Sequence, residues 1–231
     1  LTPGHADAIK ASVMNQILGG GSFNARLFQN LREDKAYTYG AYSRLSNDER
    51  IGHFTVSTQV RTSVSDSAVN EILYEMRRIQ NERVSDEDLE LTKNMMTGSF
   101  SRSLEDPQTV ANFALNIARY NLPADYYQTY LKKLADVTAG DVQEMANKYL
   151  RPENAIIIAV GEADKIAETM ACFAADGKVK RYDYYGNEVK GLQAIYGVSA
   201  EDVIAAYIEA IGGKEALKGV KDWSQNGTAT V

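Results

Sequence analysis

Arg32 and Tyr39 are the residues whose types and spacing could do chemistry. They stand seven positions apart, Arg32 near the end of an expected short helix and Tyr39 at the beginning of an expected strand. A guanidinium and a phenol placed in this way could converge on one cleft and donate hydrogen bonds to carbonyl oxygens. A surface arginine and a half-buried tyrosine are the alternative interpretation, and the residue types by themselves favour it.

Three consecutive glycines precede this pair. Gly19, Gly20 and Gly21 follow an amphipathic helix, so they could let the backbone pass close to a neighbour. Termination of the helix explains them equally well. A dinucleotide-binding loop is excluded, because Asn24 stands at the sixth position and a helix precedes the glycines instead of a strand.

The other common catalytic motifs do not occur. His5 and His53 are the only histidines and neither has H-x-x-E-H spacing, so the chain by itself predicts no zinc site. The absence of G-x-x-x-x-G-K-[ST] and G-x-S-x-G excludes nucleotide hydrolysis and serine-hydrolase chemistry. Cys172, the only cysteine, has the surroundings of a small buried apolar residue and forms no intrachain disulfide.

Composition narrows the class of protein. The 231 residues, 44% of them hydrophobic, are enough for one large domain, or for one domain and part of another. A net charge of -6 without a cluster of Lys and Arg argues against nucleic acid as a partner. No apolar run reaches the roughly 18 residues of a membrane span. Residues 1–4 contain neither an initiator Met nor the start of a signal peptide, so we expect a longer polypeptide.

The first half of the chain changes from helical spacing to alternation. Apolar residues recur every three or four positions and later every second position. These patterns predict a helix over 7–18, a short helix capped by Ser22 or Asn24 that ends near Glu33, and an antiparallel strand pair over 37–45 and 53–61.

The second half predicts mostly helices. One helix is predicted after Ser65, and three more begin at the capping residues Ser85, Asp106 and Thr138. In the helix that begins at Asp106, the side chains expected to point inward are Val110, Phe113, Ala114 and Ile117. A tyrosine-rich helix that carries Tyr127 and Tyr130 is predicted before Thr138. Residues 155–160 predict a strand buried on both faces, and 179–184 a last strand. The result is an α+β fold, with a small, mostly antiparallel sheet covered by several helices.

The chain divides into a domain over 1–187 and a tail over 188–231. The tail predicts a helix capped by Ser199 and, at 228–231, the start of a strand. Residues 207–217 weakly resemble the opening of lipoprotein-like domains that are appended to bacterial envelope peptidases. A linker helix is the alternative interpretation of the tail.

Several segments resemble one known family. Residues 18–28, 31–33 and 37–40 are similar to the C-terminal-type, non-zinc-binding domain of the pitrilysin/insulinase family of inverted-zincin metallopeptidases. The similarity continues in order through 84–89, 121–123, 137–138 and 158–161, and covers roughly residues 1 to 186. Order and spacing over so many elements make the resemblance specific.

The resemblance implies a two-layer domain that resembles half of a metallopeptidase, with its usual first strand missing. In the family, the H-x-x-E-H zinc site lies in a homologous N-terminal-type half, so zinc would be bound by a partner half and no cofactor by this chain. The two halves close around an extended peptide. Arg32 would hold a peptide carbonyl, Tyr39 would donate to the scissile carbonyl oxygen, and Gly20 and Gly21 would contact the peptide.

Two classes of function follow. The first is a non-catalytic, substrate-binding half of a zinc metallopeptidase, inactive alone, whose zinc half is on the same polypeptide or a separate chain. The second is a structural scaffold subunit that keeps the fold without proteolysis. Retention of Arg32 and Tyr39 favours the first class. We also expect a bacterial cell-envelope or periplasmic location, and self-association of the isolated domain into a homo-oligomer.

Overall fold

The computed structural model describes residues 1–21, 23–46, 51–189, 199–213 and 218. It divides the chain into two compact units, Leu1–Val179 and Lys180–Val231. The elements of the first unit are α1 (Ala8–Gly19), α2 (Arg26–Phe28), the π-helical turn η1 (Gln29–Asp34), β1 (Thr38–Leu45), β2 (Phe54–Val60), η2 (Thr62–Val64), α3 (Ser65–Asn81), α4 (Asp86–Ser103), α5 (Pro107–Arg119), α6 (Tyr130–Ala135), α7 (Ala139–Tyr149), η3 (Pro152–Asn154), α8 (Ala163–Met170) and η4 (Ala171–Phe173). The described part of the second unit contains α9 (Ala200–Ala210).

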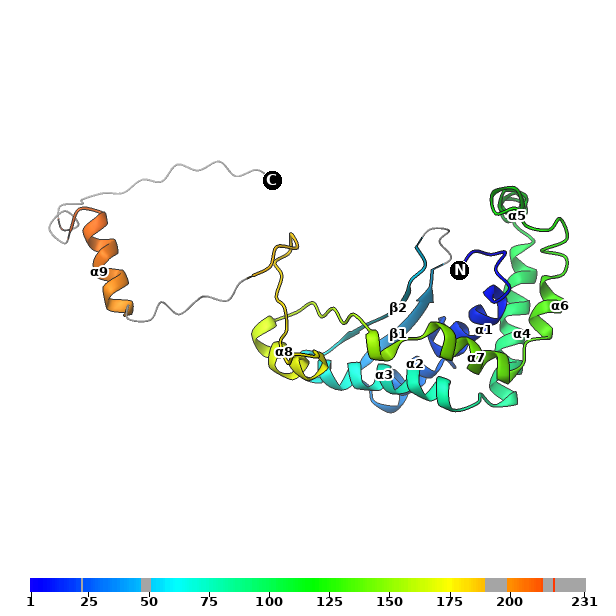
Figure 1. Ribbon diagram of the computed structural model, residues 1–231, viewed down its shortest axis with the longest axis horizontal. Coiled ribbons are helices and arrows are strands. Elements are labelled where there is room, and N and C mark those ends of the chain that lie inside the picture. Colours follow the sequence, from blue (N-terminus) through cyan, green and yellow to red (C-terminus); the bar gives the residue numbers. More distant parts are fainter. Residues whose placement is uncertain (22, 47–50, 190–198, 214–217, 219–231) are drawn as a thin grey trace. The chain divides into compact units, whose positions relative to one another are not determined.

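The first unit has a strand pair covered by helices (Figure 1). β1 and β2 are antiparallel, with Leu45 opposite Phe54 at one end and Thr38 opposite Val60 at the other. α1 packs against β1, α3 packs against β2, and α7 packs against both of these helices. The predicted α+β class, with a small antiparallel sheet and a layer of helices, is confirmed.

The hydrophobic core lies where α1 meets the strands and its neighbouring helices. Val13 and Ile17 of α1 are buried together with Met14 and Leu18, as their helical spacing predicts. Gly19 allows this close packing, because a Cβ there would lie 2.7 Å from the backbone nitrogen of Ser43 in β1. Side chains from α2, η1, α3, α6 and α7 complete the same core.

Helix caps follow the sequence signals at most positions. Ser85 accepts from the backbone N–H of Asp88 at 3.0 Å, and Asp106 accepts from that of Gln108 at 3.0 Å, which confirms both predicted caps. The short second helix differs, because Ala25 stands at its N-cap and provides no capping side chain. Asn24 therefore does not cap it, and Ser22 lies outside the described residues.

The prediction that 155–160 form a buried strand is wrong for the described structure. The segment is extended, but no hydrogen bond among the described residues joins it to β1 or β2. Ile156, Ile158 and Val160 are 90%, 82% and 97% exposed. A run of apolar residues favours a strand, but such a strand is buried only when other strands pair with both of its edges. The local sequence does not specify those partner strands.

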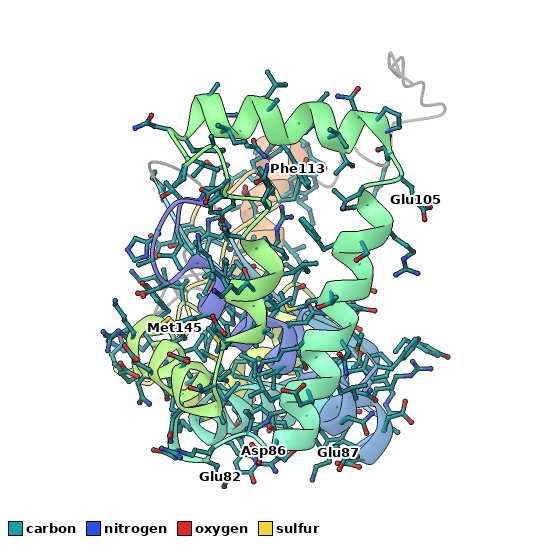
Figure 2. All side chains as sticks on the ribbon, turned by 90° about the vertical axis from the view of Figure 1, so that its right-hand side faces the viewer. Glu82, Asp86, Glu87, Glu105, Phe113 and Met145 are labelled. Carbon is teal, nitrogen blue, oxygen red and sulfur yellow. The ribbon has the colours of Figure 1, made fainter. Side chains whose placement is uncertain are left out.

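The region around α5 also differs from the prediction. α5 has no buried residue, and Val110 and Ala114 are exposed, although Phe113 is partly covered. Figure 2 shows α5 lying across the end of α4, with the labelled Phe113 beneath it. The ring of Phe113 stacks on Tyr127 at 3.7 Å between centroids. Because α5 contacts its neighbours through a few aromatic rings, its apolar face stays half-covered.

Two smaller expectations near here also fail. Tyr127 precedes the tyrosine-rich helix, which begins only at Tyr130. Cys172 is exposed instead of buried, because it lies in the short turn η4 and its thiol faces the carbonyl of Thr169 at 3.1 Å. The apolar residues next to Cys172 in the sequence do not determine which side of the turn faces the core.

The second unit is described by itself. Ser199 and Asp202 form the predicted capping box of α9, and Gly212 and Gly213 have positive φ after its end. The strand predicted over 179–184 is replaced by one isolated bridge between Tyr182 and Glu188, because the chain reverses at Asp183. The strand predicted at 228–231 lies outside the described residues, and the domain boundary after residue 187 stays a prediction. Within the described ranges, no helix is both long and apolar enough to span a membrane.

Candidate functional site

The segment that carries Arg32 is a π-helical turn. Within η1, Asn30 and Leu31 are buried, whereas Arg32 lies partly exposed between them and the turn that leads to β1. π-helical turns are rare and occur often at functional sites. The Tyr37 N–H donates to the Leu31 carbonyl at 2.8 Å, so the end of η1 and the beginning of β1 are held together.

η1 is anchored on α3 by a buried polar cluster. The Asn30 amide donates to Glu75 Oε1 and to Glu71 Oε2, both at 2.9 Å. Glu75 is only 2% exposed and also faces the Arg78 guanidinium at 3.4 Å. A buried carboxylate needs such partners, because an unpaired one would carry the full cost of desolvation. The cluster therefore fixes the position of the turn on which Arg32 lies.

The Arg32 side chain leans on an aromatic ring. Its guanidinium carbon lies 4.7 Å from the centroid of the Phe28 ring, and its Nε lies 3.6 Å from Glu33 Oε1. A guanidinium above an aromatic ring is attracted by the negative face of the ring, and its several N–H groups remain able to donate to other acceptors. Arg32 is thus oriented by Phe28 and can still donate along its edge.

Between η1 and β1 the chain makes a tight turn at Ala36. This residue has φ +52°, the left-handed region that favours glycine. Its N–H donates to the Arg32 carbonyl at 3.1 Å, which closes the turn. The left-handed residue sets the direction in which the chain enters β1, and so it links the two candidate residues.

Tyr39 lies in a β-bulge. Thr38 is opposite Val60 and Ala41 is opposite Thr58, so Tyr39 and Gly40 of β1 face one residue of β2. The phenol is 94% exposed. Arg32 and Tyr39 therefore lie on consecutive elements joined by one hydrogen-bonded turn, each at an irregularity of the backbone.

Gly20 and Gly21 have structural explanations. A Cβ on Gly20 would collide with Gln16, and Gly21 has φ +105°, a conformation that glycine adopts easily. No hydrogen bond or ion pair in the described structure joins either glycine to Arg32 or Tyr39. Their contact with a peptide stays a prediction, as do the roles of Arg32 and Tyr39.

Sequence reasoning missed the groups that position the two candidates. Asn30 and Glu75 are polar residues inside helical patterns, and their burial depends on the packing of η1 on α3. The bulge depends on the register of β1 against β2. The sequence did contain weak signs of the bulge. Gly40 interrupts a strand rich in aromatic residues, and a glycine inside a strand often marks a bulge; Thr58 lies on the facing strand.

The described residues do not form a metal site. They contain no group of three or more His, Cys, Asp or Glu side chains that could hold an ion. His5 accepts through Nδ1 from the Asp7 N–H at 3.1 Å, which is a local turn contact. The residues present therefore do not fit zinc within this part of the chain.

The known proteins that are similar to this chain include zinc proteases and their homologues. Residues 2–96 match the family model of the peptidase M16 inactive domain. The uncharacterized zinc protease YmxG of Bacillus subtilis is 32% identical over 105 residues, which are 46% of this chain and 25% of that protein. The non-peptidase homolog YmxG of Helicobacter pylori is 24% identical over 139 residues, 60% of this chain and 32% of that protein. The chain thus spans about a quarter to a third of these curated relatives.

Solved structures share the fold. The peptidase M16 inactive domain from Pseudomonas fluorescens has a TM-score of 0.59 at 25% identity, covering 66% of this chain and 36% of that one. The periplasmic protease PqqL from Escherichia coli has a TM-score of 0.52 at 20% identity, covering 62% of this chain and 16% of that one. At that identity the second likeness concerns the fold alone.

Proposed function

Because residues 2–96 match the family model of the peptidase M16 inactive domain, we propose that this chain is the non-catalytic, substrate-binding half of a zinc metallopeptidase. In this proposal it completes a peptide-binding chamber whose zinc site lies in a partner half. The observation that carries the proposal is that two hydrogen-bond donors, the partly exposed Arg32 and the exposed Tyr39, lie on consecutive elements that are joined by one hydrogen-bonded turn. A fold kept only for packing has no need to present both.

The proposed roles follow from the chemistry of the two groups. The guanidinium of Arg32 donates to a backbone carbonyl of an extended peptide and fixes its register. The phenol of Tyr39 donates to the scissile carbonyl oxygen, whose negative charge grows as the transition state forms. Donation to a growing charge lowers the barrier, whereas donation to an unchanged carbonyl strengthens binding only.

The partner is proposed on the same basis. The described residues hold no metal cluster, and relatives are named zinc proteases, so we assign the zinc to a homologous half on the same polypeptide or on another chain. An extended peptide is the proposed substrate. A periplasmic or cell-envelope location is part of the proposal; the E. coli protein that shares the fold is itself a periplasmic protease.

The test is the hydrolysis of a quenched fluorescent peptide library by the full-length protein, or by the complex that contains both halves. We expect Tyr39→Phe to lower kcat about 100- to 1,000-fold with little change in KM, the usual loss for one oxyanion donor. Arg32→Ala is expected to raise KM more than it lowers kcat, because its contact is present in the ground state as well.

A matched control separates chemistry from folding. Tyr74 is a half-exposed tyrosine on α3, so Tyr74→Phe removes one hydroxyl outside the proposed site and should leave kcat unchanged. Equal activity of wild type and Tyr39→Phe would contradict the role of Tyr39. The wild-type chain by itself is expected to be inactive.

The second candidate function is that of a scaffold subunit. It is supported by the H. pylori relative, whose name describes a non-peptidase homolog. The two candidates differ in the partner half: the scaffold function requires that no combination of halves cleaves the library, although the assembled protein is folded. Zinc bound in the partner together with peptide cleavage would exclude it.

A further inference from the structure

We propose that the hydroxyls of Thr38 and Thr58 are positioning groups that hold the β-bulge and so present the Tyr39 phenol to the substrate. The proposal rests on the function assigned above to Tyr39. Neither threonine is in a recognisable motif; what singles them out is their contact with the irregular part of β1.

The bulge is what turns Tyr39 outward. In β1, Ala41 and Ser43 are buried, whereas Tyr42 and Arg44, which alternate with them, are exposed. Continued with its period of two, this alternation would place residue 39 on the buried face. The extra residue shifts the phase by one, and Tyr39 becomes 94% exposed instead. Any group that maintains the bulge therefore controls where the phenol points.

Two threonine hydroxyls supply the hydrogen bonds that the bulge removes from the ladder. The Gly40 N–H donates to Thr38 Oγ1 at 3.1 Å, and Thr58 Oγ1 donates to the Gly40 carbonyl at 3.0 Å. Thr38 Oγ1 in turn donates to the Gln59 carbonyl at 2.7 Å. This set uses the single hydrogen of each hydroxyl once.

The two hydroxyls also form a unit. Their oxygens lie 3.1 Å apart, and Thr38 Oγ1 lies 2.9 Å from the Gly40 carbonyl, so it can replace Thr58 as donor. Loss of one hydroxyl can thus be partly compensated by the other. The double substitution removes both, and it leaves the N–H and C=O of Gly40 without these partners.

The experiment is a double-mutant cycle in the full-length protein or two-half complex, with the same peptide library. Thr38→Val/Thr58→Val should lower kcat about 10- to 100-fold with KM nearly unchanged, the usual cost of a misplaced catalytic group. In a Tyr39→Phe background the same pair should cause no further loss. The conservative pair Thr38→Ser/Thr58→Ser retains both hydroxyls and should restore kcat.

Thr55→Val is the matched control, since Thr55 lies on β2 opposite Arg44, away from the bulge. A second readout follows amide hydrogen exchange at Gly40, which should become faster in the double valine variant and stay unchanged in Thr55→Val. Unchanged exchange in the double variant would overturn the proposal, whatever the activity.

The failures of the two proposals are distinguishable. If Tyr39→Phe lowers kcat and the valine pair multiplies that loss in the same background, the threonines act independently of Tyr39; the positioning role is then wrong and the proposed function stands. If Tyr39→Phe leaves kcat unchanged, the role of Tyr39 fails first, and the positioning role falls with it.

Discussion

Ala36 adopts a backbone conformation that costs an ordinary L-residue roughly 1–2 kcal/mol. It does so at the point where the chain leaves η1 and enters β1, with its N–H bonded to Arg32. Strain of this kind persists only where the surrounding contacts over-determine it. Here those contacts are the hydrogen bonds that bring the ends of η1 and β1 together.

Replacement of Ala36 by glycine should therefore stabilise the chain. Relief of the left-handed strain, less the larger unfolded-state entropy of glycine, gives a net gain of about 0.5–1 kcal/mol. Urea denaturation would show it as a higher midpoint with an unchanged m value. Ala111→Gly, in the regular helix α5, should instead lower stability by about 1 kcal/mol. A lower free energy of unfolding for Ala36→Gly than for wild type would contradict the view that Ala36 is strained.

At the scale of elements, α1 and α7 are held together by charges as well as by apolar packing. Lys10 Nζ lies 2.6 Å from Asp141 Oδ1, and Asp7 Oδ2 accepts from Lys148 at 2.5 Å and from Tyr149 at 2.6 Å. Burial by itself would raise the pKa of Asp141, but hydrogen bonds from Lys10 and Thr138 outweigh it and lower that pKa to about 2.

This pKa predicts an acid-sensitive stability. Because the folded pKa of Asp141 lies below the unfolded value of 3.8, its contribution is complete above about pH 4 and disappears as the pH falls toward 2. After allowance for solvent screening it amounts to about 1 kcal/mol. Thermal unfolding between pH 5 and 2 should show a steeper loss for wild type than for Asp141→Asn. Asp125→Asn, at an exposed position, should follow the wild-type profile.

The sequence predicted those elements whose signals are local. Ser85, Asp106 and Thr138 cap their helices as expected, because a capping side chain and the N–H groups it accepts from are a few residues apart. Residues 155–160 failed because pairing partners of a strand are distant in sequence. For the candidate site, the sequence predicted the two chemical groups, Arg32 and Tyr39, but not their arrangement. Its geometry depends on strand register and on the burial of Asn30 against Glu75, which composition and period do not determine.

At the scale of the whole chain, the segment 155–160 is an exposed apolar surface within the described structure. Ile156 and Ile158 are exposed to solvent, and the main-chain groups of the segment form no ladder within the described structure. An extended apolar segment of this kind is prone to pair with another chain. We therefore expect self-association of the isolated chain to occur through residues 155–160.

A charge in the middle of that segment should weaken self-association. Ile158→Lys is expected to shift the isolated chain toward monomer, because an edge lysine opposes strand pairing at little cost where the side chain is already exposed. Sedimentation velocity over a range of concentrations would measure the shift. Ser101→Lys adds the same charge at an exposed position on α4 and should leave the distribution unchanged. Wild type that sediments as a monomer at every concentration would contradict the prediction.

The bulge at Tyr39 and Gly40 has a consequence for how such chains diverge. Deletion of a single codon there would restore an unbroken ladder between β1 and β2 and return the strand to its regular alternation. If the deleted residue is Tyr39, the phenol is lost together with the bulge, while the helices and the core could remain as they are. A lineage could in this way pass from a peptide-handling half to a purely architectural one by losing one residue, and overall sequence similarity would hardly record the change.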